Sequence, residues 1–459
     1  MKKTNLFDRF EPVSAKAFKQ NIQFDLKGAS YNDSLVWRTN EGIDVTPFYH
    51  RDTQKVLLPV PGMPTQWYIG ESIFILNAGQ SAETAIAAIE AGTEAIYFSA
   101  AAPFDYKILL DTIKNTDIPL FFSLNFLETT FYKEMYAYAF AKAYNVTLKL
   151  DLIHHLVTDG NWFTTLEKDH QNFDMLLQTP NNSGVTIDMT VYQNAGATMT
   201  QQLGYGLAHL NEYLNRIEEK GGSLTKITFE VGIGTNYFFE IAKLRALRQM
   251  TAVLLQEYPF GAAVSAVDII AHPTRRNKTI YDYNTNMLRT TTECMSAVLG
   301  GANMVVNMPY DALYHKTNDF GQRISRNQLI VLKKESYFDA VSNPSDGTYY
   351  IEEITHKLGT KGLNLLKEIE KGGGFLKQLK AGIIQRKTKE SADKEQAQFN
   401  AQEITLLGTN KHPNPNDRMK DDIELYPFVK IKPRKTIIAP IIPRRLAEKS
   451  EQDRLTKEV

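Results

Sequence analysis

The stretch KITFEVGIGTNYFFEIAKLRALR, residues 226–248, decides the fold of this chain. From Ile227 to Val231 apolar and polar side chains alternate, which is the period of a strand with one buried face. Gly232 and Gly234 then allow a tight turn, and from Tyr237 onward apolar side chains recur at helical spacing. A strand, a glycine-containing loop and a helix make half of a βα unit. In an α/β barrel, the loop of such a unit lies at the face where the chemistry takes place.

The loop after this strand carries no side chain suited to acid–base or nucleophilic chemistry. Its centre is Gly234 and Thr235, and no His, Cys, Asp or Glu occurs between Val231 and Phe239. We therefore expect one of the best catalytic positions of the barrel to be empty.

Seven more β-rich runs of this kind occur along the chain, and helical patterns follow them. Eight short runs alternating with helices predict a (β/α)8 TIM barrel over residues 71–320. An open, doubly wound sheet is the alternative, but it seldom uses eight repeats, and no Gly-x-Gly-x-x-Gly follows the first run. The eight runs are 73–76, 94–99, 119–125, 146–152, 184–190, 226–231, 266–271 and 302–308.

The flanking segments have a different composition. Residues 1–70 are broken up by prolines and predict an N-terminal extended arm. Residues 321–459 predict a mainly helical C-terminal extension, with a helix break at the triple glycine 372–374 and a late strand at 404–408.

The bulk composition excludes several classes of protein. The 459 residues carry 52 basic and 52 acidic side chains, so neither a nucleic-acid partner nor a membrane surface is expected. Cys294 is the single cysteine, which excludes an internal disulfide and fits a reducing cytoplasm. The start of the chain is not a signal peptide, and no apolar run is long enough to span a bilayer.

Few residues are candidates for a site. His272, Arg275 and Arg276 follow the seventh run and could hold a phosphate or carboxylate, or make a loop salt bridge or a partner contact. Tyr192 and Gln193 follow the fifth run and either line a remnant pocket or pack in the core. Thr235 lies in the sixth loop. His154 and His155 are consecutive at the end of the fourth run, with no Glu or Cys at ligand spacing, so we expect no metal.

Several motifs, in order along the chain, resemble the methylmalonyl-CoA mutase family of adenosylcobalamin-dependent isomerases. Each motif is weak alone, but the ordered series runs from about residue 30 to 450 and identifies the chain as a member. The motifs are WRTNEGI (37–43), YQNAGA (192–197), FFEIAKLRALR (238–248), NMLRTT (286–291), GGA (300–302), DFGQRISRN (319–327), NPSDGTYYIE (343–352) and RRLAE (444–448).

This resemblance implies the same barrel, with an acyl-CoA chain threading its bore and cobalamin capping it. It also implies a separate flavodoxin-like domain, C-terminal to the barrel, that carries the cobalt-ligating His. Catalytic members place a His in the sixth loop, where this chain has Gly234, and glycine has no side chain to polarise a thioester carbonyl. The segment 58–70 lacks the family's Arg-Pro-Trp-Thr pattern, and 272–276 (HPTRR) replaces its Gln-Thr-Ser-Gly. The motif Asp-x-His-x-x-Gly appears nowhere, and the chain ends where the cobalamin domain would begin.

With these departures from the catalytic pattern, the chain resembles the small subunit of a heterodimeric mutase. We expect a non-catalytic chain with no catalytic residue of its own, whose larger partner binds adenosylcobalamin and the acyl-CoA that is interconverted between methylmalonyl-CoA and succinyl-CoA. One alternative is a catalytic barrel chain that takes cobalamin from a separate small subunit. Another is an unrelated barrel lyase whose site starts at Lys149 and Asp151 on the fourth run.

Overall fold

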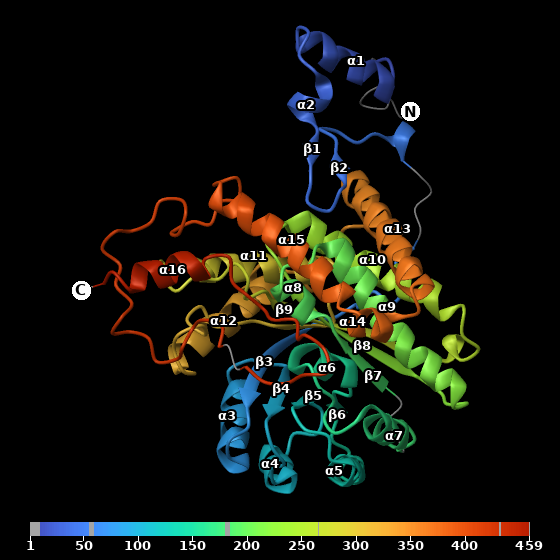
Figure 1. The fold of residues 1–459 in the computed structure, drawn as a ribbon, viewed down its shortest axis with the longest axis vertical. Coiled ribbons are helices and arrows are strands. Elements are labelled where there is room, and N and C mark those ends of the chain that lie inside the picture. Colours follow the sequence, from blue (N-terminus) through green and yellow to red (C-terminus); the bar gives the residue numbers. More distant parts are fainter. Residues whose placement is uncertain (1–9, 55–58, 180–183, 265, 431–432, 459) are drawn as a thin grey trace, which may run out of the picture.

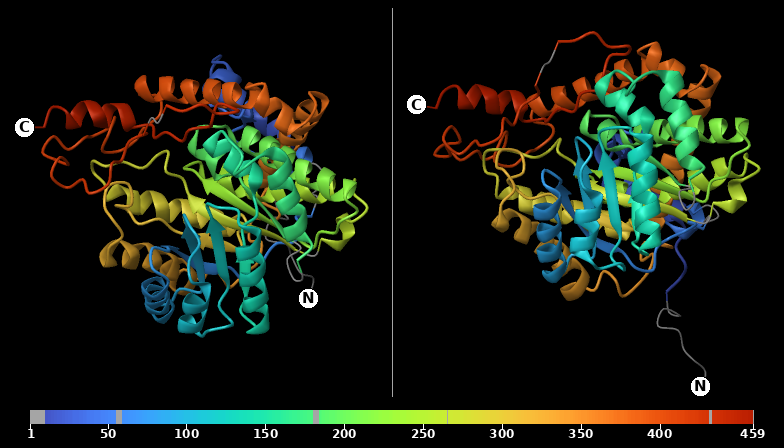
Figure 2. Two further views of the ribbon diagram at one scale, coloured as in Figure 1. Left: turned by 60° about the horizontal axis from the view of Figure 1, so that its bottom comes forward. Right: turned by 90° about the horizontal axis from the view of Figure 1, so that it is seen from below.

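The computed structural model describes residues 10–54, 59–179, 184–264, 266–430 and 433–458. Eight parallel strands form one curled sheet in the order β6-β5-β4-β3-β10-β9-β8-β7, with helices outside it (Figures 1 and 2). The predicted (β/α)8 barrel, with its N-terminal arm and mainly helical C-terminal extension, is confirmed. The division of the chain at residues 70 and 320 stays a prediction. The strands are β3 (Tyr68–Phe74), β4 (Ala95–Ala100), β5 (Leu120–Leu124), β6 (Val146–Leu148), β7 (Gly184–Asp188), β8 (Lys226–Ile233), β9 (Ala266–Pro273) and β10 (Met304–Val306).

Each of the eight predicted runs overlaps a strand, but the bounds differ, most of all at the first and the fourth. β3 begins at Tyr68, five residues before the predicted run. The prediction placed this strand late because Gly70 and Ser72, which face the barrel axis, interrupt the apolar pattern. A Cβ at Gly70 would lie 2.9 Å from Cγ2 of Val306, so the close approach of β10 requires glycine there. β6 ends at Leu148.

The fourth run was predicted to continue as strand to residue 152, and this is wrong. The Asp151 carboxylate accepts a hydrogen bond of 2.9 Å from the backbone N–H of His154 and begins helix α6 (Leu152–Asp159). His154 and His155 therefore lie on a helix and not at the end of a strand. An aspartate before an apolar stretch is a helix start signal that the strand interpretation overlooked.

The barrel has a seam between β6 and β7. Within the described part of the chain these two strands are the ends of the sheet order, and no ladder joins them. One long backbone hydrogen bond, from Thr186 N to Leu150 O at 3.4 Å, crosses the seam, and so does one of 2.7 Å from Asp188 N to the Asp151 carboxylate. Side-chain contacts therefore help to close the barrel between β6 and β7, where no β-ladder forms among the described residues.

The helices form an outer layer that is thickest over β7, β8 and β9. Helix α13 packs against α9 and α10, and α14 and α15 continue the layer (Figure 1). None of the helices in the described ranges is long and apolar enough to cross a membrane. The outer helices are α3 (Ala78–Glu90), α4 (Tyr106–Ile113), α5 (Thr129–Ala141), α7 (Leu166–Leu177), α8 (Thr190–Asn194), α9 (Met199–Glu219), α10 (Tyr237–Leu255), α11 (Thr285–Leu299), α12 (Asp319–Ile330), α13 (Tyr349–Lys371), α14 (Phe375–Lys380) and α15 (Ile383–Asn400).

The N-terminal arm projects from the body and contains α1 (Ala15–Asp25), α2 (Tyr31–Leu35), β1 (Trp37–Arg38) and β2 (Asp44–Val45) (Figure 1). Its anchor is Glu41, whose carboxylate accepts hydrogen bonds of 2.8 Å from the backbone N–H groups of Met199 and Thr200. These N–H groups belong to the first turn of α9, so the carboxylate satisfies donors that have no partner inside the helix.

The C-terminal segment lies across the carboxyl ends of the strands. Its backbone donates hydrogen bonds from Ile441 N to Val157 O (2.8 Å), from Arg444 N to Asn194 O (3.1 Å) and from Leu446 N to Arg276 O (2.9 Å). It ends in α16 (Glu448–Leu455). The predicted strand at 404–408 is wrong: only an isolated bridge forms there, between Leu407 and Lys411.

Candidate functional site

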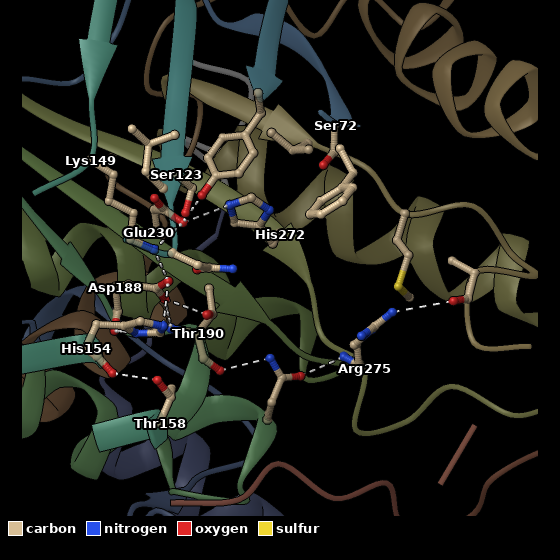
Figure 3. Close-up of a pocket in the computed structure, with 18 of the residues that line it drawn as sticks. Ser72, Ser123, Lys149, His154, Thr158, Asp188, Thr190, Glu230, His272 and Arg275 are labelled. Carbon is tan, nitrogen blue, oxygen red and sulfur yellow. Dashed lines mark hydrogen bonds and ion pairs between the residues drawn. The ribbon is translucent and has the colours of Figure 1, made fainter. Parts of the chain in front are cut away.

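A pocket of about 570 Å³ opens at the carboxyl ends of the strands, the face where barrels of this kind hold their sites (Figure 3). Its walls come from the ends of seven strands, from α6, and from the loops after β9 and β10. The pocket is therefore built by the order of the barrel strands and not by one local motif.

A network of buried charges forms the floor of the pocket. The Lys149 ammonium makes an ion pair with Asp188, and its Nζ lies 3.5 Å from Oε2 of Glu230. The Tyr97 hydroxyl donates a 2.8 Å hydrogen bond to Glu230, and the His154 Nε2 lies 3.4 Å from the Asp188 carboxylate. The side chains of Lys149, Asp188 and Glu230 are 13%, 6% and 4% exposed, so each charge depends on the others for its compensation.

The network fixes Lys149 as a cation. Burial alone would lower the pKa of Lys149, but the Asp188 and Glu230 carboxylates outweigh it and hold that pKa well above its usual range. Burial alone would raise the pKa of Asp188, but the neighbouring His154 and Lys149 keep that pKa below its usual range. An amine that stays protonated is not free to form a Schiff base or to accept a proton. The lyase alternative based on Lys149 therefore lacks its nucleophile.

Asp151, the other half of that alternative, is fully engaged below the floor. Its carboxylate lies 2.8 Å from Nε2 of His209 and accepts a 2.9 Å hydrogen bond from the hydroxyl of Tyr213. Together with the bonds from His154 N and Asp188 N, these contacts place three groups on Oδ1 and one on Oδ2. Burial would raise the pKa of Asp151, but His209 and the other neighbours hold it below its usual range. Asp151 lines the pocket and also closes the seam of the barrel, with both carboxylate oxygens hydrogen-bonded to the protein.

Below the charged floor the bore is filled by side chains. An apolar cluster from β4, β9 and β10 occupies the axis of the barrel, with Phe121 of β5 packed against it. Among Tyr97, Phe121, Lys149 and Ile270 a cavity of about 10 Å³ remains, which is the lower limit for a single water molecule. The members of the cluster are Ala95, Tyr97, Ile270, Met304 and Val306.

Gly234 lies in a tightly packed environment. A Cβ at this residue would lie 2.7 Å from Nε2 of Gln193 and 3.1 Å from Oε1 of Glu240. The same Glu240 oxygen accepts a 2.8 Å hydrogen bond from the backbone N–H of Gly234. The space that a larger residue would need is therefore taken by Gln193, which is also hydrogen-bonded to Gln202.

The structure brings two of the predicted site residues into the pocket and leaves three outside its walls. His272 and Arg275 line the pocket. Tyr192 is buried, with its hydroxyl 3.3 Å from Nδ1 of His209 and its ring against the core. Gln193 packs under the sixth loop, and Thr235 is exposed at its tip. Whether His272 and Arg275 act on a ligand stays a prediction.

Sequence reasoning missed the acidic half of the floor. Asp188 and Glu230 stand in the runs GVTIDMT and KITFEVG at alternate positions that face the axis. An acidic residue near the end of a strand with a buried face is a signal that was available, because such a charge needs a partner. In the described part of the chain no three His, Cys, Asp or Glu side chains are placed to share a metal ion.

Comparison with known proteins gives consistent matches. A sequence model of the family described as methylmalonyl-CoA mutase matches residues 79–440. The chain is 31% identical over 456 residues to the methylmalonyl-CoA mutase small subunit of Porphyromonas gingivalis, a match that covers 92% of this chain and 73% of that relative.

Two further relatives match over a shorter region. The methylmalonyl-CoA mutase of Rhizobium meliloti is 32% identical over 255 residues, which is 54% of this chain and 36% of the relative. The methylmalonyl-CoA mutase large subunit of Propionibacterium freudenreichii subsp. shermanii is 31% identical over 252 residues, or 53% and 35%. The matched regions thus span about a third of the length of these two relatives.

Proposed function

Because this chain belongs to the methylmalonyl-CoA mutase family, we propose that it is the small, non-catalytic subunit of a heterodimeric methylmalonyl-CoA mutase. The assembly would interconvert methylmalonyl-CoA and succinyl-CoA in the cytoplasm. The relative from Porphyromonas gingivalis that carries a small-subunit name covers nearly the whole chain and so supports this role. The partner would be a larger subunit of the same family, with the projecting N-terminal arm as one contact.

The filled bore is the observation that carries the proposal. The family resemblance implies that an acyl-CoA chain threads the barrel of a catalytic member. In this chain the same space holds the ring of Phe121, the Met304 side chain and the buried Lys149–Glu230 pair, around a cavity of about 10 Å³. A pantetheine arm would have to displace a packed cluster and a compensated charge network together. The residues of this chain therefore do not fit the acyl-CoA in the way that the family requires.

The cofactor also belongs with the partner in this proposal. Adenosylcobalamin supplies the radical that rearranges the carbon skeleton when it is bound, and it needs polar groups placed on the substrate beside it. Gly234 offers no side chain to a thioester carbonyl.

The test is to purify the tagged chain from its native cell and identify what accompanies it. We expect a larger homologous chain, and we expect methylmalonyl-CoA turnover with adenosylcobalamin from the pair but not from this chain alone. Co-purification of a short cobalamin-binding protein without a barrel, with turnover from that pair, would instead assign the catalytic barrel to this chain.

Restoring histidine at Gly234 is expected to give no mutase activity. The bore stays closed in the Gly234→His variant, and the new side chain must displace Gln193, whose Nε2 lies 2.7 Å from the Cβ position. We expect a loss of about 1–3 kcal/mol in the free energy of unfolding, as for other overpacked sites. Urea denaturation and a turnover assay with adenosylcobalamin check both parts. Gly234→Ala is the control, since it brings the Cβ contact without the imidazole; turnover by the histidine variant alone would contradict the proposed role.

A further inference from the structure

The pocket of about 570 Å³ at the carboxyl ends of the strands is called the mouth pocket below. The charged side chains around it fall into two groups. Its acids are buried and already engaged. Asp188 and Glu230 share Lys149, and Asp151 accepts hydrogen bonds at the seam. Asp311 accepts a hydrogen bond from Asn318 and lies 3.2 Å from Nδ1 of His315. The charged side chains that reach solvent at the rim are basic, namely Arg275 and Lys316. A molecule entering the pocket therefore meets positive charge first.

Arg275 has no ionic partner. Its guanidinium donates one long hydrogen bond of 3.4 Å to the carbonyl oxygen of Ala312, and no carboxylate of the described residues lies within ion-pair distance of it. Its backbone N–H donates a 2.8 Å hydrogen bond to Oδ1 of Asn194, and the same oxygen accepts from the Thr274 hydroxyl at 3.0 Å. The base of the side chain is thus held at the rim while most of its donors stay available, as Figure 3 shows.

His272 lines the same pocket, but its Nε2 is directed at Glu230 and not at the open space. Its Nε2 is buried without a hydrogen bond among the described residues, at 3.6 Å from Oε2 of Glu230. Its ring stands edge-on to Tyr97 at a centroid distance of 5.4 Å, so it is held in place between the charged floor and the open space. In Figure 3 the ring of His272 and the side chain of Arg275 lie around one open space.

Part of the remaining wall is apolar, among polar side chains such as Ser123, Asn307 and Gln322. Phe74 at the end of β3 lines the pocket and is 49% exposed as a residue, although it lies inside the mouth of the barrel. Leu124 and Phe163 also line the pocket, and the Phe163 ring is stacked on His155 at a centroid distance of 3.6 Å. A large exposed aromatic side chain within a cavity is a contact that a ligand with an apolar body would use.

We propose that the mouth pocket binds a small organic anion, a carboxylate or a phosphate monoester, with the anionic end at Arg275 and the apolar body against Phe74. The volume of about 570 Å³ is in the range of small-molecule sites. A guanidinium without an ionic partner has donors left for paired hydrogen bonds to the anion. The pocket lies above the filled bore, so this site is compatible with a chain that does no chemistry of its own.

The test measures the binding of three probes to the full-length chain by calorimetry: phenylacetate, phenyl phosphate and the neutral phenylacetamide. We expect at least one anion to bind with a Kd below about 1 mM, and the amide to bind roughly tenfold or more weakly. The tighter of the two anions assigns the class of the natural ligand. Failure of both anions to bind, or equal binding of the amide, would overturn the proposal.

Arg275→Gln is the matched variant. It is expected to weaken binding of the favoured anion by roughly tenfold to a hundredfold while leaving phenylacetamide unchanged, because only the charge-assisted hydrogen bonds are lost. Arg386→Gln is the control, since Arg386 is an exposed arginine of α15 that does not line the pocket. Unaltered anion binding by Arg275→Gln, with the melting temperature of the wild type, would remove Arg275 from the site and overturn the proposal as stated.

Discussion

Replacing Lys149 by methionine is expected to destabilise the chain by about 3–5 kcal/mol, the effect of leaving buried charge without its partner. Lys149 is the cation that Asp188 and Glu230 share, at side-chain exposures of 6% and 4% for the two carboxylates. Methionine keeps the volume of the side chain, so the loss reports the charge and not a cavity. The ion pair with Asp188 also crosses the seam between β6 and β7, so the variant weakens the closure of the barrel.

Urea denaturation of the purified variant measures this loss. Lys389→Met is the control, because Lys389 pairs with Asp393 on the exposed face of α15 with side chains 75% and 63% exposed. Such surface pairs contribute little to stability, so the control is expected to unfold at the same urea concentration as the wild type. If Lys149→Met unfolded at the same urea concentration as Lys389→Met, the floor of the pocket would not be a compensated charge network.

The strands of the barrel could be predicted from the sequence because each repeats one local pattern. Alternating side chains predict β8, and the helical period predicts α10 directly after it. The fourth strand was overextended because Leu148, Leu150 and Leu152 continue the alternating apolar pattern of a strand. The capping role of Asp151 depends on a hydrogen bond from His154 N. The first strand was placed late because Gly70, which faces β10, is not apolar.

The site could be predicted only where it depends on one loop. His272 and Arg275 follow a predicted strand, so their place at the mouth of the barrel could be expected. Tyr192 also follows a strand, but the short helix α8 turns its ring into the core. The Lys149–Asp188 and Lys149–Glu230 contacts join residues 39 and 81 positions apart. Such contacts depend on which inward side chains the curled sheet brings together, and a local pattern carries no information on that.

A second buried pair permits a sharper test, because its two members can be neutralised together. Lys278 and Glu293 are fully buried, with Nζ 2.7 Å and 2.9 Å from the two carboxylate oxygens, and Asn277 donates a 2.7 Å hydrogen bond to the same carboxylate. Burial lowers the pKa of Lys278, and burial raises the pKa of Glu293, each against the influence of the other. The pair connects the loop after β9 to α11 and lies outside the mouth pocket.

Lys278→Met alone is expected to lower the free energy of unfolding by about 3–5 kcal/mol, and adding Glu293→Gln is expected to recover at least about half of that loss. The glutamine keeps an acceptor for Asn277 and removes the uncompensated charge.

The pH dependence of stability follows from the raised pKa of Glu293. Because the folded state then retains a proton that the unfolded state releases above about pH 4.3, stability falls as the pH rises toward the folded pKa. Without Lys278 that pKa rises further, so the single variant should lose more stability at pH 8 than at pH 5, while the double variant should lose a similar amount at both. Equal losses for the single variant at the two pH values would mean that Glu293 is not charged in its folded surroundings, and that the loss comes from packing alone.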